Sequence, residues 1–153
     1  MKTVSNTQIF VDTNILFYAS NPADAFGAQA IARIDELANA HNSLIISTQV
    51  IREYTAVTLR KAQFHKLPFD TALTIVLKNV AIFRRDFIVV GEKFDNLDNW
   101  LALLPQITTS KDVFDFNIAA TLQSEKIDHI LTHNVSDFKK FSNWLTVLPL
   151  ITT

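Results

Sequence analysis

Short runs of apolar residues recur along the chain, and segments long enough to form helices separate them. The runs that predict buried strands lie at residues 9–11, 44–46, 87–90, 129–132 and, at an edge, 147–151. The segments that predict helices are 24–40, 48–64, 68–85, 94–104 and 111–124. Strands that alternate with helices are typical of parallel sheets, because each helix carries the chain back to the edge where the next strand starts. The pattern therefore predicts an α/β fold with a central, mostly parallel sheet.

Capping and stop signals mark the boundaries of several of these helices. Ser47 or Thr48 is expected to cap the second helix, and Ser110 the fifth. Pro68 is expected to open the third helix and Pro105 to end the fourth, since proline is tolerated at a helix start but not in its interior.

The composition fits one globular domain. The chain has 153 residues, of which 48% are hydrophobic and 19% charged. This length and apolar content are enough for a single core, so we expect residues 1–153 to form one domain. The 14 basic and 15 acidic side chains nearly cancel. Any contact with nucleic acid must therefore come from a local patch of charge and not from the field of the whole chain.

The scarcity of cysteine and glycine excludes several kinds of site. No cysteine occurs, which removes disulfides, thiolate metal sites and cysteine nucleophiles and fits a reducing, cytoplasmic location. The two glycines, Gly27 and Gly91, lie too far apart for glycine-rich nucleotide loops or for the nucleophile turn of serine hydrolases. The N-terminal segment lacks the continuous apolar stretch of a signal peptide, and no apolar run of about 18 residues predicts a membrane span.

Two acidic residues occur at positions that an ordinary soluble fold would make apolar. Asp12 directly follows the run 9–11, so its carboxylate is expected at the carboxyl end of a central strand, where parallel α/β sheets bind their ligands. An ordinary helix N-cap or turn is the alternative. Glu53 borders the apolar stripe of its predicted helix. It either belongs to a site or is held at the rim by a salt bridge with Arg52 or Arg60.

Asp115 is the strongest of these signals. Ile118, Ala119 and Leu122 follow it on the same helix face, which places a carboxylate in the middle of the surface expected to pack on the sheet. A buried carboxylate needs compensation from a cation, a structural cap or a buried arginine. Asp112, one turn earlier, either faces the same region or favours the helix start through the helix dipole.

A further pair of polar residues follows the fourth predicted strand. Asn134 and Asp137 are expected at the same edge of the sheet as Asp12. Ordinary turn and capping chemistry is the alternative. Because acids from separate elements meet at one edge, and hard oxygen ligands suit Mg²⁺ or Mn²⁺, the pattern indicates a divalent-metal site of the kind that serves phosphoryl chemistry.

Four motifs in order make the chain resemble a known family. They are residues 10–16 (FVDTNIL), 47–54 (STQVIREY), 115–120 (DFNIAA) and 131–138 (LTHNVSDF). In order and spacing they are similar to the motifs of PIN domains, and most similar to those of the VapC-type toxins of bacterial toxin–antitoxin pairs. The resemblance covers nearly the whole chain. It implies a three-layer α/β/α sandwich with a central, mostly parallel sheet.

The resemblance also implies an activity and a set of site residues. It implies an endoribonuclease that uses Mg²⁺ or Mn²⁺, with Asp12, Glu53 and Asp115 as catalytic acids and metal ligands. The family often has aspartate where this chain has Asn134, so Asp137 or water is expected to supply the remaining ligand. The other residues expected to line the pocket are Thr13, Asn14, Asp112, Thr132 and Asn134.

The same resemblance suggests the partners. We expect an RNA substrate, a cognate antitoxin protein and a homodimer, and no membrane. Basic residues expected to contact RNA are Arg52, Arg60, Lys61 and Lys139. Aromatic residues of the middle segments are candidates for an interface between subunits, namely Phe64, Phe69, Phe83, Phe94 and Trp100.

Two other functions are compatible with part of this pattern. A degenerate PIN fold that only binds RNA or another protein is favoured by Asn134 and disfavoured by the intact Asp12, Glu53 and Asp115. A response-regulator receiver domain also carries acids and Mg²⁺ on a parallel α/β fold. It needs an aspartate at the tip of its third strand, whereas the third acid here lies on a predicted helix.

Overall fold

The computed structural model describes residues 4–151 and contains, within them, one sheet of five parallel strands. The strands are β1 (Gln8–Val11), β2 (Ser43–Ser47), β3 (Ile88–Val90), β4 (His129–Thr132) and β5 (Thr146–Pro149). Their order across the sheet is β3-β2-β1-β4-β5, which places β1 in the centre, and every neighbouring pair is parallel. The predicted parallel sheet is confirmed.

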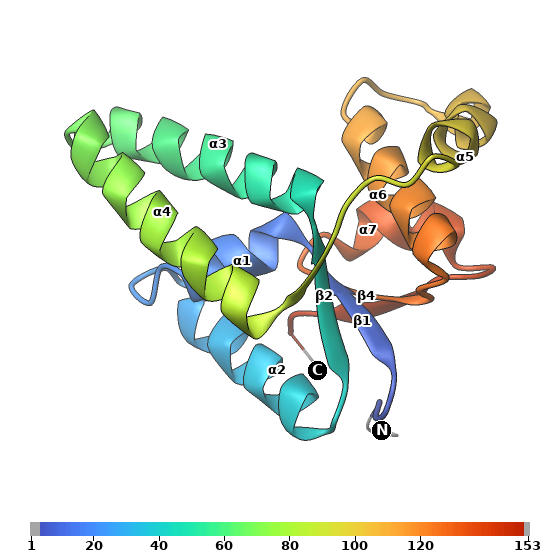
Figure 1. Ribbon diagram of the computed structural model, residues 1–153, viewed down its shortest axis with the longest axis horizontal. Helices are drawn as coiled ribbons and strands as arrows, with labels where there is room; N and C mark the ends of the chain where they lie inside the picture. The colour runs from blue at the N-terminus through green and yellow to red at the C-terminus, as the bar shows by residue number, and fades with distance from the viewer. Residues whose placement is uncertain (1–3, 152–153) are drawn as a thin grey trace.

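Within the described residues, seven α-helices and two 3₁₀ turns connect these strands. They are α1 (Thr13–Ala19), α2 (Gly27–Asn39), α3 (Thr48–Phe64), α4 (Phe69–Asp86), α5 (Asn96–Leu103), α6 (Asp112–Glu125) and α7 (Val135–Phe138), with the 3₁₀ turns at Leu104–Gln106 and Lys139–Phe141. Figure 1 shows α1 to α4 on one side of the sheet and α5 to α7 on the other. The fold is a three-layer α/β/α sandwich, as expected. None of these helices is both long and apolar enough to cross a membrane.

The sequence pattern does not predict α1. Its seven residues are too few to show a helical period, and most of them are β-branched or aromatic, which makes them weak helix formers. The helix forms because the Asp12 carboxylate accepts a hydrogen bond from the Thr13 N–H and caps it. Ile15, Leu16 and Phe17 are buried against the core, so packing stabilises what local propensity does not.

The helix α2 begins at Gly27, later than the sequence pattern predicts, because the chain before it makes a tight turn. The Asp24 N–H donates to the Asn21 carbonyl in this turn (2.8 Å). A Cβ atom at Gly27 would lie 2.4 Å from the Asn21 carbonyl oxygen and 2.9 Å from Cα of Pro22. The turn and the helix start approach so closely that only glycine fits without a shift of the main chain.

Ser47 and Pro68 mark helix starts as predicted. The Ser47 hydroxyl accepts a hydrogen bond from the Val50 N–H (3.3 Å) and caps α3, and Pro68 directly precedes α4. The prediction that Ser110 caps α6 is wrong, because α6 begins at Asp112 without a side-chain cap. The N–H groups that such a cap would bind, those of Asp112 and Val113, donate instead to the main-chain carbonyls of Thr109 (3.1 Å) and Ser110 (3.4 Å).

The register of the sheet brings the ends of its central strands to one edge. Phe10 pairs with Ile45 of β2 and with Ile130 of β4, and each of the three is at most 2% exposed. Such strands are apolar on both faces because helices cover both faces of a parallel sheet. Directly beyond β1, the Asp12 N–H donates to the Leu131 carbonyl of β4 (3.0 Å). The acid that follows the central strand is therefore fixed beside the end of the neighbouring strand.

Candidate active site at the carboxyl edge of the sheet

Asp12 ends β1 and begins α1. Its Oδ1 atom accepts a hydrogen bond from the Thr13 N–H (2.7 Å), which caps the helix. Its Oδ2 atom accepts hydrogen bonds from Asn14 Nδ2 (2.8 Å) and Thr132 Oγ1 (2.6 Å). The two interpretations of Asp12, helix cap and site carboxylate, are thus combined in one side chain.

Burial makes the Asp12 carboxylate difficult to ionise. The residue is only 6% exposed, and this burial is the main reason why its pKa is raised to about 6. The hydrogen bonds from Thr132, Thr13 and Asn14 act in the opposite direction, whereas the negative charge of Glu53 raises the pKa further. A cation nearby would favour the ionised form.

Glu53 reaches the same edge from α3. Its two carboxylate oxygens accept hydrogen bonds from Thr13 Oγ1 (2.8 Å) and Gln49 Nε2 (2.5 Å). These contacts fix the carboxylate between α1 and α3. In residues 4–151, no ion pair joins Glu53 to Arg52 or Arg60. The structure therefore gives no support to the alternative in which an arginine holds Glu53 at the rim.

Asp115 lies in the first turn of α6 and also faces the cavity. Its Oδ2 atom is buried and has no hydrogen-bond partner. Burial is the main cause that raises its pKa to about 7. The negative charges of Asp137 and Asp12 raise this pKa further, and the positive charge of Lys111 opposes them. A cation-binding site without its cation is expected to contain such an oxygen, which is buried, has no hydrogen-bond partner and lies close to other acids.

Asn134 and Asp137 approach the cavity from the region of α7. Asp137 Oδ2 accepts a hydrogen bond from Lys111 Nζ (3.0 Å), and the Lys111 side chain is largely exposed. The chain thus supplies one positive charge of its own to this acid. The Asn134 N–H donates to Thr132 Oγ1 (3.0 Å), and its side-chain amide is neutral. On this side of the cavity the negative charge therefore comes from Asp137.

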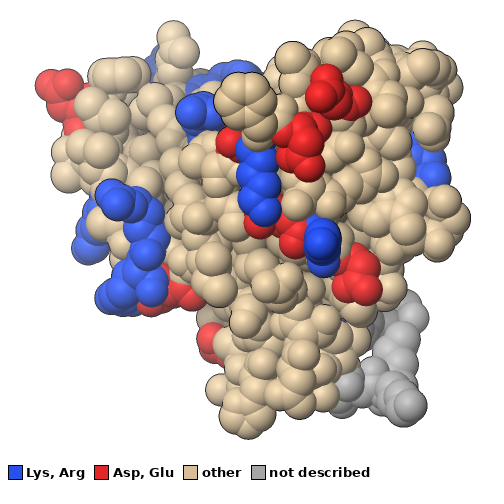
Figure 2. Space-filling model, turned by 45° about the vertical axis from the view of Figure 1, so that its right-hand side comes forward, with Lys and Arg blue, Asp and Glu red and all other residues tan. Residues whose placement is uncertain are grey.

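These residues line one open cavity of about 900 Å³. Its carboxylates are Asp12, Glu53, Glu92, Asp115 and Asp137. Its basic side chains are Arg52, Arg60, Lys61 and Lys111, and its apolar wall includes Phe17, Ala56, Val57 and Phe114. Figure 2 shows a face of the molecule on which acidic and basic side chains lie close together. The cavity combines acids that suit a cation with bases that suit a polyanion.

The sequence predicts that Asp112 lines this cavity, but in the structure the residue lies outside the lining. Its Oδ2 atom accepts hydrogen bonds from the N–H groups of Thr108 (3.0 Å) and Thr109 (3.2 Å). Its Oδ1 atom lies 3.0 Å from Lys140 Nζ. These contacts, above all the main-chain bond from Thr108, hold the pKa of Asp112 well below its ordinary value. The residue stabilises the loop before α6, which agrees with the alternative of a role at the helix start.

Thr132 and Lys139 also lie outside the cavity lining. Thr132 is fully buried and acts from below the cavity, where it donates to Asp12 and accepts from Asn14 Nδ2 (3.2 Å). Lys139 is exposed in the 3₁₀ turn after α7. The remaining residues predicted for the site all line the cavity: Asp12, Thr13, Asn14, Arg52, Glu53, Arg60, Lys61, Asp115, Asn134 and Asp137.

Gln49 and Asn117 also line the cavity. They lie inside the motifs 47–54 and 115–120, but neither is among the residues predicted for the site. Gln49 Nε2 donates to Glu53 Oε1 and to the Phe114 carbonyl (3.2 Å), and Gln49 Oε1 accepts from Asn117 Nδ2. This one amide therefore connects α3 to α6 across the cavity. A signal for Gln49 exists in the sequence, because it precedes Glu53 by four residues and so shares its helix face. Asn117 lies in the motif that begins at Asp115, but nothing in that motif predicts its contact with Gln49.

The donor set fits a divalent cation in kind. The carboxylates of Asp12, Glu53, Asp115 and Asp137 face one cavity, and the unpaired oxygen of Asp115 is free to act as a ligand. As the side chains stand, no three acidic or histidine residues between residues 4 and 151 are gathered closely enough to hold an ion. Uptake of a cation therefore requires these side chains to move together.

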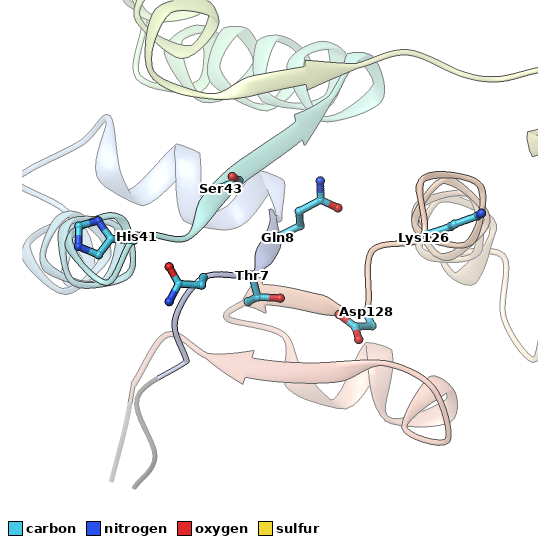
Figure 3. Close-up of a pocket in the computed structure, with 7 residues that line it drawn as sticks. Thr7, Gln8, His41, Ser43, Lys126 and Asp128 are labelled. Atoms are coloured by element: carbon cyan, nitrogen blue, oxygen red, sulfur yellow. The ribbon is translucent and has the colours of Figure 1, made fainter.

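A second cavity, of about 420 Å³, lies at the opposite, amino-terminal edge of the sheet. Polar residues line it: Asn6, Thr7, Gln8, His41, Ser43, Lys126 and Asp128. Figure 3 shows His41 and Lys126 on opposite sides of this cavity, with Thr7 and Gln8 between them. The side chains point in different directions, so the acidic cavity is the better candidate for an active site.

The fold and the cavity define a class, the parallel α/β proteins that gather acids from separate elements at the carboxyl edge of the sheet. No protein-family model matches the chain, and no curated protein matches it by sequence. Solved structures do match. The chain has the PIN-like fold of the VapC toxins, as its sequence motifs predict.

Three of the matching structures illustrate this likeness. VapBC2 from Rickettsia felis, bound to a DNA fragment from its promoter, matches with a TM-score of 0.67 and 19% identity over 93% of this chain and 98% of that chain. VapC20 from Mycobacterium tuberculosis, a sarcin–ricin loop cleaving toxin, matches with a TM-score of 0.61 and 18% identity over 80% and 86%. VapBC-1 from nontypeable Haemophilus influenzae matches with a TM-score of 0.58 and 18% identity over 94% and 98%.

Proposed function

We propose that the protein is a metal-dependent endoribonuclease and the toxin of a type II toxin–antitoxin pair. One observation carries the proposal: a carboxylate oxygen of Asp115 is buried without a partner in a cavity that other acids share. The fold supports the same conclusion, because one structure of this fold is that of a sarcin–ricin loop cleaving toxin.

The metal would be Mg²⁺ or Mn²⁺, held by Asp12, Glu53, Asp115 and Asp137. When bound, such an ion supplies positive charge to a phosphate group and lowers the pKa of a water molecule. Carboxylate oxygens are the ligands that both ions prefer.

The chain's own residues orient the reacting groups. Thr132, Thr13 and Asn14 fix the Asp12 carboxylate through three hydrogen bonds. Thr13 and Gln49 fix Glu53 in the same way, so Glu53 acts as a ligand or accepts the proton of the attacking water. Attack of water on phosphorus with departure of the 3′-oxygen leaves a 5′-phosphate and a 3′-hydroxyl end.

Basic side chains on α3 would bind the RNA backbone. Arg52, Arg60 and Lys61 line the cavity and are exposed, and the first two lie on one helix face because they are eight residues apart. Lys61 Nζ lies 4.4 Å above the centre of the Phe17 ring, which holds its charge over the apolar wall. Lys139 adds a positive charge outside the cavity.

The proposal includes protein partners. Structures of the same fold include VapBC complexes, which supports a cognate antitoxin partner for this chain. A homodimer is supported by large exposed aromatic side chains, with Phe64 81% and Phe69 63% exposed. Phe83 is 5% exposed and belongs to the core, so it is not available for an interface. The reducing environment that a cysteine-free chain suits supports a cytoplasmic location.

The test is cleavage of RNA by the purified protein in the presence of Mn²⁺, Mg²⁺ or EDTA. We expect cleavage with either metal and none with EDTA, and calorimetry should detect Mn²⁺ binding without RNA. RNA binding without cleavage in all three conditions would favour the second candidate, a PIN-fold module that binds RNA or protein. Two features support that candidate: the neutral Asn134 and the Lys111 side chain that already pairs with an acid.

A further inference from the structure

Phe114 is an exposed aromatic residue at the acidic cavity. It lies on α6 directly before Asp115, lines the cavity and is 61% exposed. Of the large apolar side chains that are exposed between residues 4 and 151, it is the only one in the lining of this cavity. A phenyl ring at such a position gains little from folding, because much of its apolar surface stays in water.

The main chain that carries this ring is held in place. Gln49 Nε2 donates to the Phe114 carbonyl (3.2 Å) and also to Glu53 Oε1 (2.5 Å). The same amide thus fixes the position of the ring's backbone relative to a site carboxylate. A ligand that contacts the ring would be placed at a defined distance from the acids.

The surroundings of the ring indicate the chemistry of that ligand. The cavity has acids that would hold a metal ion, and it has four basic side chains that suit a phosphate, Arg52, Arg60, Lys61 and Lys111. A ligand that has an anionic group and a flat, apolar group suits both the basic side chains and the exposed ring. A nucleotide of a polynucleotide has this character, since its base stacks on an aromatic ring while its phosphates contact basic residues.

We propose that Phe114 stacks on one unpaired base of the RNA beside the phosphate that is cleaved. The inference rests on the proposed ribonuclease function and adds the residue that holds a base beside the cleavage position. A base inside a duplex is already stacked on both faces, so the ring selects RNA that is single-stranded or looped at the cleavage position. Phe114 is in this role a positioning and specificity-determining residue, because it contacts the substrate but not the reacting atoms.

The experiment measures RNA binding in EDTA, so that the RNA stays intact. The probes are a fluorescein-labelled short single strand of random sequence and a blunt RNA duplex of the same length. Phe114→Ala is compared with Phe114→Trp, which keeps an aromatic face. The matched control is Phe94→Ala, since Phe94 is another exposed phenylalanine but lies outside the cavity. Thermal melts of all variants establish that they fold.

We expect Phe114→Ala to weaken binding of the single strand by roughly 5- to 150-fold, the usual effect of losing one stacked base. Binding of the duplex should be weak and unchanged. Phe114→Trp should bind the single strand like the wild type, and so should Phe94→Ala.

Several outcomes would overturn the stacking role. If Phe114→Ala binds and cleaves RNA as Phe94→Ala does, the stacking role is wrong while the ribonuclease function stands. If the wild type neither binds nor cleaves RNA, the proposed function fails and the stacking role fails with it. If Phe114→Ala still binds RNA but no longer co-purifies with a co-expressed antitoxin, the ring contacts a protein and not a base.

Discussion

The carboxyl groups of Asp12 and Asp115 are the groups whose ionisation this fold opposes most. Burial raises their pKa values to about 6 and about 7, whereas both groups ionise near pH 4 in an unfolded chain. At neutral pH the metal-free folded protein therefore carries charges that favour unfolding. The burial of these two carboxyl groups favours the binding of a cation but lowers the stability of the metal-free protein.

Asp12→Asn is expected to lower Mn²⁺-dependent RNA cleavage by more than about 100-fold while the domain stays folded. The amide keeps the size of the side chain but loses the charge that would attract the cation. Cleavage rates and circular dichroism, measured on the same samples, test this. Asp35→Asn, which removes an exposed carboxylate of α2, is the matched control and should cleave like the wild type. A folded Asp12→Asn protein with undiminished cleavage would remove Asp12 from the mechanism.

The stability of the metal-free protein is expected to fall as the pH rises from about 4 to about 7. Over this range the unfolded chain has released the Asp115 proton while the folded protein still holds it, so each increase in pH favours unfolding. Asp115→Asn removes the part of this effect that comes from Asp115 and leaves the smaller part that comes from Asp12. Its free energy of unfolding should match that of the wild type near pH 4. At pH 8 it should be higher by on the order of 1–2 kcal/mol, a value reduced for the solvent screening of a partly exposed group.

Urea denaturation in EDTA at several pH values measures this difference. Added Mg²⁺ should then raise the melting temperature of the wild type more than that of Asp115→Asn, because the variant has lost a ligand. A variant that is less stable than the wild type at every pH would show instead that Asp115 is a structural hydrogen-bonding residue.

Among the elements, α3 and α6 form opposite walls of the cavity, and each brings an acid to it. The Gln49 amide of α3 joins the two walls through the Phe114 carbonyl and the Asn117 side chain of α6. On the other side of α1, the turn at Asn21 and the start of α2 at Gly27 fix how α2 packs. Close main-chain contacts of this kind tolerate little change in side-chain volume.

Gly27→Ala is expected to destabilise the protein by about 1–3 kcal/mol, because the new Cβ would overlap the Asn21 carbonyl oxygen. Gly91→Ala is the matched control. A Cβ there meets no atom within 4 Å, so we expect a change within about 0.5 kcal/mol or a small gain in stability. Urea denaturation of both variants measures the difference. Equal stabilities would mean that the turn moves aside without cost.

The sequence predicts the elements that carry a long or regular signal and misses those that depend on tertiary contacts. The apolar run before Asp12 predicts both a central strand and an acid at its end, and the structure has both. The helix α1 is too short for a period, and packing decides its formation. The salt bridge between Asp112 and Lys140 joins two segments that only the folded chain brings together. The Gln49 amide likewise reaches α6 only because the two helices face each other.

At the scale of the whole molecule, apolar side chains remain exposed along the end of α3 and on α4. They are Phe64, Leu67, Phe69, Ile75, Leu77 and Ile82. Several large exposed apolar side chains on neighbouring elements favour an interface with another protein. The acidic cavity does not include these residues, so an interface here leaves the cavity open.

We expect light scattering at micromolar concentration to give the mass of a dimer. Replacing Phe64 and Phe69 together by serine should weaken the dimer by at least about tenfold, because large aromatic residues dominate the energetics of many interfaces. The matched control is Phe94→Ser, which changes a still more exposed ring that is not one of these residues. A monomeric mass for the wild type would contradict the homodimer, and a dimer that survives the double substitution would place the interface elsewhere.

The hydrogen bond from Thr132 to Asp12 joins residues that are 120 positions apart. On a growing chain the Asp12 carboxylate therefore cannot meet this partner until Thr132 has been made. The strand β4, which lies beside β1 in the sheet, is likewise made long after β1. The acidic cavity thus cannot form on a nascent chain that stops short of β4.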